Sequence, residues 1–370
     1  MSSSSTMGNA RSLPDDPVSV AESLIAENRA GEAAALLAAC VDANRGGLLL
    51  RLTLQKAFAA MGDTSAALAA ARETAQLNPD AAPAALALGD ALRMAGYLPA
   101  AIAEYQRALR LDPDIDGARA GLGSAWLDAG EAEKALDAWR ELAAEGLPLL
   151  IQKIADAEAV LRRPRSDPRY VRHLFDQFAP DYDARMVAQL HYRAPAILRE
   201  LGDLLGLAAG APHAILDLGC GTGLMGAAVR DWACRLDGID LSPSMVQKAR
   251  QRDIYDELAV ADIMDWLAVC ERRYALVVAA DTLVYLGELS ALVAEVTRVL
   301  SPGGHFLFTV EYKNGDGFAL GPRRRWRHSE SYLRLAARSA ELELAGLVVC
   351  ELRREAGAPV EGLAVALRAQ

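Results

Sequence analysis

A glycine-rich stretch that also carries an acid indicates a site for a nucleotide-like cofactor. In ILDLGCGTGLMG (215–226), Asp217 comes two positions before Gly219, the first of three alternating glycines that continue with Gly221 and Gly223. Glycines at a strand-to-helix turn allow a ligand to approach the backbone closely. Read from Gly221, the letters G-T-G-L-M-G also fit the dinucleotide pattern G-x-G-x-x-G. The spacing predicts a cofactor loop and leaves the cofactor open.

The charge of Asp217 discriminates between cofactors. A pyrophosphate at the usual place would meet this carboxylate across a few ångströms, which costs roughly a few kcal/mol at an effective dielectric of about 20. With a ligand that carries an ammonium group the interaction becomes attractive, because the carboxylate can then orient that group directly or through water. S-adenosylmethionine carries an α-ammonium and a sulfonium but no phosphate. We therefore expect S-adenosylmethionine as the cofactor, S-adenosylhomocysteine as its product, and no metal ion.

Two more acids are expected at the ends of the following strands. Asp240 follows Gly219 at the spacing of the ribose-binding acid of dinucleotide enzymes, so it is placed to accept both ribose hydroxyls, a role that those enzymes share. Asp262, in AVADIMDW, is placed to meet the adenine amino group, with Ile263 and Trp266 beside the ring. Asp262 would also suit a helix N-cap, and Trp266 would be a core-facing residue that also touches the ligand.

The candidates for catalysis lie where the methyl acceptor should bind. Methyl transfer is a displacement, so alignment of the reacting groups matters most and can be worth about 7 to 11 kcal/mol. A general base is needed for an alcohol, phenol or ammonium, but not for a carboxylate or thiolate. Asp281 and Tyr285 follow the fourth strand, and His328 lies in a later insertion. His328 would act as a general base or simply precede the helix in SESYLRLAA.

Aromatic residues of the segment 170–190 are expected to cover the sulfonium. Phe175, Phe178 and Tyr182 recur at helical or near-helical spacing, and an aromatic ring facing a cation adds about 0.5 to 2 kcal/mol. The two phenylalanines would equally pack the helix onto the sheet. Tyr182 is the better ligand candidate because it follows the pair AP, where the helix should break.

The insertion KNGDGFALGPRRRWRHSE (313–330) is rich in glycine and arginine, and it predicts a loop that closes over the substrate. Its arginines form a solvated face, or one or two of them bind a carboxylate or phosphate of the substrate. They are Arg323, Arg324, Arg325 and Arg327.

Alternating strands and helices must position these residues. Short apolar runs at 214–219, 236–241, 258–262, 275–281 and 305–311 are separated by helical stretches. This alternation indicates a mostly parallel sheet covered on both faces. The later runs LAGLVVCELRRE and GLAVALRA are joined only by AGAPVE, which is too short for a crossover, so they should pair as an antiparallel hairpin.

The first half of the chain is repetitive, with a period of about 34 residues, the length of a stacking helix-turn-helix unit. The best copy is 82–115, and its small and large positions recur one period earlier and one period later. Small residues let two helices approach, and larger ones fill the groove between units. The copies resemble tetratricopeptide repeats over about 48–149, with an irregular capping unit around 18–45. The repeats would serve as a scaffold, a dimer surface or a peptide-binding groove.

The motifs ILDLGCGTG, GIDLSPSMVQKAR, VAD, LVVAADTLVYLGEL and LSPGGHFLFTVE together resemble class I S-adenosylmethionine-dependent methyltransferases over nearly all of 165–370. With HLFDQFAPDYDARM, LHYRAP, RWRHSESYLRLAA and the repeats, the chain is similar to predicted methyltransferases with tetratricopeptide repeats. The resemblance implies a cofactor site that also includes Leu241, Met245 and Ala280 beside the acids and glycines above. Met245 would face the core as well. Tyr182 and Cys220 complete the expected cofactor-binding set.

The expected organisation is a disordered tail (1–16), an all-α TPR-like helical repeat domain (17–163) and an α/β Rossmann-like class I methyltransferase domain (164–370) with a mostly parallel sheet and an antiparallel C-terminal hairpin. Residues 1–160 hold 13 Lys and Arg against 22 Asp and Glu, a formal charge of −9 within the −10 of the whole chain. So acidic a half is a poor nucleic-acid binder. Partners are therefore expected to be a peptide, a protein or a second copy.

The remaining features bear on compartment and on alternative functions. The five cysteines form no C-x-x-C pair, which argues against a zinc site or a disulfide framework. No run approaches the roughly 18 apolar residues of a membrane span, and the first residues lack the apolar core of a signal peptide. A cytoplasmic enzyme is expected, with its acceptor left open.

The alternatives are a binding scaffold with an inactive or cofactor-sensing domain, and a nicotinamide oxidoreductase, which Asp217 and the terminal hairpin disfavour.

Overall fold

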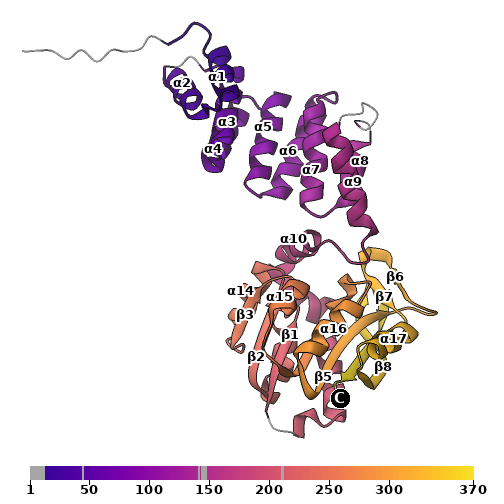
Figure 1. Ribbon diagram of the computed structural model, residues 1–370. Helices are drawn as coiled ribbons and strands as arrows, with labels where there is room; N and C mark the ends of the chain where they lie inside the picture. Colours follow the sequence, from indigo (N-terminus) through magenta and orange to yellow (C-terminus); the bar gives the residue numbers. More distant parts are fainter. Residues whose placement is uncertain (1–12, 44–45, 141, 143–147, 210–211) are drawn as a thin grey trace, which may run out of the picture. The chain divides into compact units, whose positions relative to one another are not determined.

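The computed structural model describes residues 13–43, 46–140, 142, 148–209 and 212–370 (Figure 1). The chain forms two compact units, Met1–Leu161 and Arg162–Gln370. The predicted domain boundary lies slightly further along the chain. The predicted tail falls mostly outside the described residues, and the first helix begins at Pro17. Within the described residues, no helix combines the length and apolarity that crossing a membrane requires.

The first unit consists of helices that follow one another in pairs (Figure 1). The first helices of three pairs start at residues 48, 82 and 116, and the second helices start at 64, 98 and 132. The helix starts therefore recur with the period, and in the register, that the sequence repeat predicts. The helices are α1 (Pro17–Ala26), α2 (Ala30–Asp42), α3 (Leu48–Ala60), α4 (Thr64–Leu77), α5 (Ala82–Met94), α6 (Leu98–Leu111), α7 (Asp116–Asp128), α8 (Ala132–Trp139) and α9 (Pro148–Arg162).

Glycines make these pairs possible in two ways. Gly62, Gly96 and Gly130 occupy the turns between paired helices with φ of +75°, +79° and +76°, a conformation that other residues adopt only with strain. Gly123 instead faces the indole of Trp139, which is fully buried. A Cβ added at Gly123 would lie 2.1 Å from the indole nitrogen, so only a glycine lets α7 and α8 approach to this distance.

Nine strands of the described residues in the second unit form one sheet in the order β3-β2-β1-β4-β5-β7-β6, with β9 on β5 and β8 on β9. Strands β1 to β5 and β7 pair in parallel, whereas β6, β8 and β9 pair antiparallel. The strands are β1 (His213–Leu218), β2 (Ala233–Asp240), β3 (Glu257–Val260), β4 (Tyr274–Ala279), β5 (Leu300–Tyr312), β6 (Phe318–Leu320), β7 (Trp326–His328), β8 (Glu343–Glu355) and β9 (Ala358–Arg368).

Helices cover both faces of this sheet, and the core alternates between the faces along each strand. In β4, Val277 and Ala279 pack with α15, α16 and α17, whereas Leu276 and Val278 pack with α12 and α13. Such continuous apolar runs are typical of parallel strands buried on both sides. The helices of this unit are α10 (Pro168–Phe178), α11 (Tyr182–Ala184), α12 (Ala194–Leu204), α13 (Leu224–Val229), α14 (Pro243–Arg250), α15 (Ile263–Val269), α16 (Ser290–Val299) and α17 (Glu330–Ser339), with short turns η2 (Ala179–Asp181), η3 (Arg185–Gln189), η4 (Leu207–Ala209), η5 (Arg230–Trp232), η6 (Leu283–Tyr285) and η7 (Pro322–Arg324).

Two predictions about the C-terminal part need correction. The insertion 313–330 is not a plain loop, because β6 and β7 form a small ribbon whose second strand joins the end of β5. The predicted antiparallel hairpin is present, but its turn is shorter than AGAPVE. Ala356 and Gly357 both adopt positive φ, +48° and +80°, which gives the tight two-residue turn favoured by twisted hairpins. Strand β9 therefore begins at Ala358.

Candidate cofactor and acceptor site

The glycine loop joins the end of β1 to α13 at the carboxyl edge of the sheet. Gly219, Gly221 and Gly223 have φ of +70°, +55° and +92°, so each occupies the left-handed region that favours glycine. A Cβ at Gly219 would lie 2.4 Å from the Thr282 side chain, whereas a Cβ at Gly221 would meet nothing within 4 Å. The loop therefore packs closely on one side and is open at Gly221, where a ligand can approach the backbone.

Asp217 lies under this loop and is fully buried. Its Oδ2 accepts a hydrogen bond of 2.7 Å from the Tyr255 hydroxyl, and its Oδ1 has no partner among the described residues. Burial raises the pKa of Asp217 to about 7, against the lowering effect of the Tyr255 hydrogen bond. A buried acceptor without a partner is unfavourable in a folded protein, and a cationic amino group such as that of S-adenosylmethionine would supply a donor there. The site therefore fits this cofactor.

Asp240 ends β2 beside the loop and holds it in place. Its Oδ2 accepts the Gly221 N–H at 2.9 Å, and its Oδ1 accepts the Ser242 N–H at 2.8 Å. Loss of solvent raises the pKa of Asp240 to about 6, although these backbone donors act in the opposite direction. A carboxylate can accept about four hydrogen bonds. Asp240 therefore keeps acceptor capacity for hydroxyl groups of a bound ligand.

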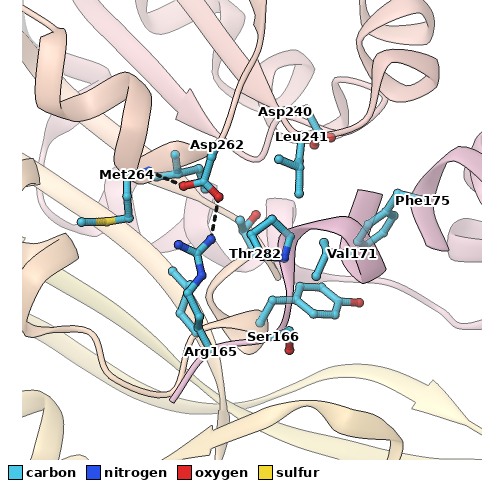
Figure 2. A pocket seen from close by; sticks show the side chains of 13 residues that line it. Arg165, Ser166, Val171, Phe175, Asp240, Leu241, Asp262, Met264 and Thr282 are labelled. Carbon is cyan, nitrogen blue, oxygen red and sulfur yellow. Dashed lines mark hydrogen bonds and ion pairs between the residues drawn. The ribbon is translucent and has the colours of Figure 1, made fainter. Parts of the chain in front are cut away.

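A pocket runs from Asp240 to the start of α15 (Figure 2). Leu241, Ile263, Met264 and Thr282 contribute to its wall. We call it the adenine pocket. It is lined by Arg165, Ser166, Pro168, Val171, Phe175, Asp240, Leu241, Asp262, Ile263, Met264, Thr282, Tyr285 and Leu286.

Asp262 is an N-cap, as its alternative interpretation predicts. Its Oδ1 accepts the Met264 N–H at 2.9 Å, and its Oδ2 forms a 2.6 Å ion pair with Arg165 (Figure 2). Trp266 does not line the adenine pocket. It packs against the core, which agrees with its alternative interpretation as a core residue, and it borders a separate hollow with Val269 and Cys270.

The segment 165–190, here called the cover segment, is fixed across the crevice by carboxylates. Asp176 of α10 accepts the Ser242 hydroxyl at 2.6 Å. Asp183 of α11 accepts the Thr222 hydroxyl of the glycine loop at 2.5 Å and pairs with a nearby arginine, Arg252. These contacts join residues 39 to 69 positions apart, and no local pattern predicts them.

Aromatic rings of the cover segment meet beside the adenine pocket. Phe175 makes edge contacts with Tyr182, at 6.1 Å between ring centroids, and with Tyr285, at 5.5 Å. Tyr182 lines a second hollow rather than the adenine pocket, and burial raises its pKa well above the usual range. Phe178 lies under the guanidinium of Arg185, 4.5 Å from the ring centroid.

Asp281 follows β4 and is held by an arginine that sequence reasoning missed. Arg353 of β8 donates to both oxygens of Asp281, at 2.8 and 2.9 Å, and is fully buried. The backbone N–H of Asp281 donates to Thr309 Oγ1 at 2.8 Å, and its φ is +57°. Burial raises the pKa of Asp281, and Arg353 opposes that rise.

The same network reaches the arginines of the insertion. Arg353 also contacts Glu311 and Glu355, and Arg325 pairs with both of these glutamates. Arg323 pairs with Glu355 too. Arg325 is thus partly buried against glutamates of the protein, whereas Arg323 stays exposed beside Glu355. Binding of a substrate oxyanion by these arginines stays a prediction. In contrast, Arg324 lies over the Tyr170 ring, at 4.7 Å from its centroid.

His328 does not reach the crevice, so its predicted role as a general base is wrong for this structure. It is fully buried, its Nε2 lies 3.0 Å from the Gly287 carbonyl oxygen, and its ring stacks on Tyr332. Burial lowers its pKa to about 4. The next residue, Ser329, caps α17, which agrees with the alternative that His328 precedes a helix.

Met245, Cys220 and Ala280 are among the predicted cofactor residues that do not line the adenine pocket, and their contact with the cofactor stays a prediction. Met245 is fully buried in α14, which agrees with its interpretation as a core residue. Cys220 is buried and its N–H donates to the Ile239 carbonyl at 2.9 Å. Ala280 packs against the core on the α12 side. Of the three, only Cys220 belongs to the glycine loop, between Gly219 and Gly221.

Comparison with known proteins finds a family match for part of the second unit. Residues 215–304 match the family of methyltransferase domains. Over 127 residues the chain is 35% identical to methyltransferase-like protein 27 of Homo sapiens, covering 34% of this chain and 43% of that protein. Over 142 residues it is 31% identical to malonyl-[acyl-carrier protein] O-methyltransferase of Serratia marcescens, covering 38% and 52%. The chain thus spans about half the length of these relatives.

Among solved structures, the N-methyltransferase NodS from Bradyrhizobium japonicum WM9, in complex with S-adenosyl-L-homocysteine, is 22% identical with a TM-score of 0.36. The match covers 45% of this chain and 84% of NodS. The second unit thus has a mostly parallel, Rossmann-like sheet, and its residues 215–304 match the methyltransferase-domain family.

Proposed function

We propose that this protein transfers a methyl group from S-adenosylmethionine to an acceptor. The observation that carries the proposal is the buried Asp217 oxygen without a partner among the described residues, directly under a loop of positive-φ glycines and next to Asp240. This arrangement suits a ligand that brings a cationic amino group and ribose hydroxyls, and it repels a pyrophosphate.

The residues of the site have distinct proposed roles. S-adenosylmethionine supplies an electrophilic methyl group, which an acceptor lone pair takes while the carbon–sulfur electron pair goes to sulfur. Asp217 orients the amino group, Asp240 accepts ribose hydroxyls, and Ile263 flanks the adenine. Asp262 can accept the adenine amino group if Arg165 releases its Oδ2. The cover segment excludes water from the crevice.

Asp281 and Tyr285 are proposed to position the acceptor. Burial raises the pKa of Tyr285 to about 12, so at neutral pH its hydroxyl is protonated and donates hydrogen bonds. Asp281 is already bound by Arg353 through both oxygens. Neither side chain is a free base, which favours an acceptor that needs no deprotonation, or one whose proton leaves to water.

The first unit is proposed to be a tetratricopeptide-like array that binds a peptide or protein or mediates self-association. The regular recurrence of its helix starts supports this proposal. Light scattering after size-exclusion chromatography distinguishes the two roles, because only self-association raises the mass of the purified protein. A reducing compartment such as the cytoplasm is also proposed, because all five cysteines are free.

Titration calorimetry with S-adenosylhomocysteine and with NAD tests the cofactor assignment. Binding of the first and not the second is the expected result. Transfer of a labelled methyl group to acceptors in a cell extract then distinguishes an enzyme from a cofactor-sensing scaffold. Tight NAD binding without S-adenosylhomocysteine binding would show the proposal to be wrong.

A further inference from the structure

A second hollow opens beside the adenine pocket and shares Phe175 and Tyr285 with it. We call it the acceptor pocket, because those shared rings lie between it and the residues assigned to the cofactor. It is lined by Leu174, Phe175, Phe178, Tyr182, Arg185, Met186, Leu190, Asp281, Tyr285, Arg323, Arg325, Arg353, Glu355 and Ala356.

The wall of the acceptor pocket has an apolar half and a charged half. The cover segment supplies the apolar half, with Leu174, Met186 and Leu190 beside the aromatic rings. The loop after β4, the end of β8 and the insertion supply the charged half, with Arg325 and Arg353 among its residues. A ligand that matches both halves has an apolar body and a charged end.

The wall of the acceptor pocket as a whole carries more guanidinium groups than the carboxylates around it neutralise. Arg323, Arg325 and Arg353 share three acids, Asp281, Glu311 and Glu355. The fourth guanidinium, Arg185, makes no ion pair with any described residue and is exposed above the Phe178 ring. The pocket thus keeps one unneutralised positive charge, held next to the apolar half. Guanidinium groups of this kind recognise carboxylate and phosphate oxygens.

Backbone strain gathers around the same wall. Asp281, Arg323 and Ala356 all line the acceptor pocket and all have positive φ, at +57°, +66° and +48°. Arg324 adds a fourth such residue next to the wall, at +58°. Non-glycine residues in this region each cost of order 1–3 kcal/mol and cluster at ligand sites. The strained residues lie where the charged half of the pocket is assembled.

We infer that the methyl acceptor is an amphipathic molecule with an apolar body and an oxyanion, a carboxylate or a phosphate, bound at Arg185 and Arg325. This inference rests on the proposed methyltransferase function and adds the substrate class. A cationic acceptor such as a lysine side chain would meet the surplus positive charge and is disfavoured.

Three probes that differ in one group test the inference: phenylacetate, benzylphosphonate and phenylacetamide. Each is titrated calorimetrically into the full-length protein saturated with S-adenosylhomocysteine, at low salt. The carboxylate, the phosphonate or both should bind at least tenfold more tightly than the uncharged amide. The comparison of the two anions identifies which oxyanion the pocket prefers.

Arg185→Gln should weaken binding of the preferred anion about tenfold and leave the affinity for S-adenosylhomocysteine unchanged. The matched control is Arg338→Gln, which removes another exposed arginine without an ion pair among the described residues, on α17. The inference is overturned if the amide binds as well as the anions, if no probe binds, or if both variants behave alike. Failure of S-adenosylhomocysteine itself to bind would instead refute the proposed function.

Discussion

Replacing Asp217 by asparagine tests the electrostatic basis of the cofactor site. The side chain is fully buried, and its pKa is about 7 in the folded protein against an ordinary value of 3.8. The folded state therefore binds the proton more tightly than the unfolded chain. Between about pH 4 and pH 7 the folded state keeps a proton that the unfolded chain has released, so the free energy of unfolding falls as the pH rises through this window.

The magnitude follows from those two pKa values. Between pH 6 and pH 8 the free energy of unfolding of the wild-type second unit should fall by about 1.4 kcal/mol because of Asp217. For a unit of about 200 residues this corresponds to a melting temperature about 3 to 5 °C lower at pH 8. Asp217→Asn should lack most of this dependence. The neutral amide should also weaken S-adenosylhomocysteine binding at least tenfold, because it removes a charge-assisted hydrogen bond worth about 1.5–3 kcal/mol.

Differential scanning calorimetry at both pH values measures the first effect, on the transition that S-adenosylhomocysteine shifts to higher temperature. Titration calorimetry measures the second. Asp265→Asn, at an exposed carboxylate on α15, is the matched control. If Asp217→Asn keeps both the wild-type pH dependence and the wild-type affinity, the reasoning about a buried, unpartnered carboxylate is wrong.

The other predictions concern the neighbouring carboxylate and two close approaches. Asp240→Ala should abolish detectable S-adenosylhomocysteine binding in calorimetry while the circular dichroism spectrum stays native; unchanged affinity would refute the ribose assignment. Gly219→Ala should also abolish it, because the new Cβ would lie 2.4 Å from Thr282 and the residue needs positive φ; retained binding would contradict the loop geometry. Gly123→Ala should destabilise the first unit by about 1–3 kcal/mol in denaturant melts, because the new Cβ would meet Trp139. The affinity for S-adenosylhomocysteine should not change. A wild-type melting curve would contradict the close packing of α7 on α8.

The periodic pattern of apolar residues along the chain predicts the strands and helices whose formation depends on residues close together in sequence. The apolar run 275–281 corresponds to β4, which ends slightly earlier, at Ala279, because Asp281 adopts a left-handed backbone conformation. The helix-turn-helix repeat predicts the register of helices α3 to α8. In both cases the signal is a burial pattern with a fixed period, which each segment carries by itself.

The acceptor side of the site depends on side-chain contacts between residues far apart in the sequence, which a periodic burial pattern does not predict. Arg353 reaches Asp281 across 72 positions, and in sequence it is one of two adjacent arginines in a strand. His328 shows the opposite case. It lies among glycines and arginines that predict a loop, yet β6, β7 and α17 bury it beside Phe318 and Tyr332. Which polar side chains meet is decided only when the elements dock.

The wall of the adenine pocket begins very soon after the helical unit ends. Helix α9 stops at Arg162, and Arg165 and Ser166 already line the pocket and bond to Asp262 and to the Tyr285 carbonyl. A variant that begins at residue 168, made to isolate the second unit, would therefore lose part of the wall of the adenine pocket. A proteolytic nick at residues 163–167 would detach the same strip, so limited digestion there should be slowed by S-adenosylhomocysteine.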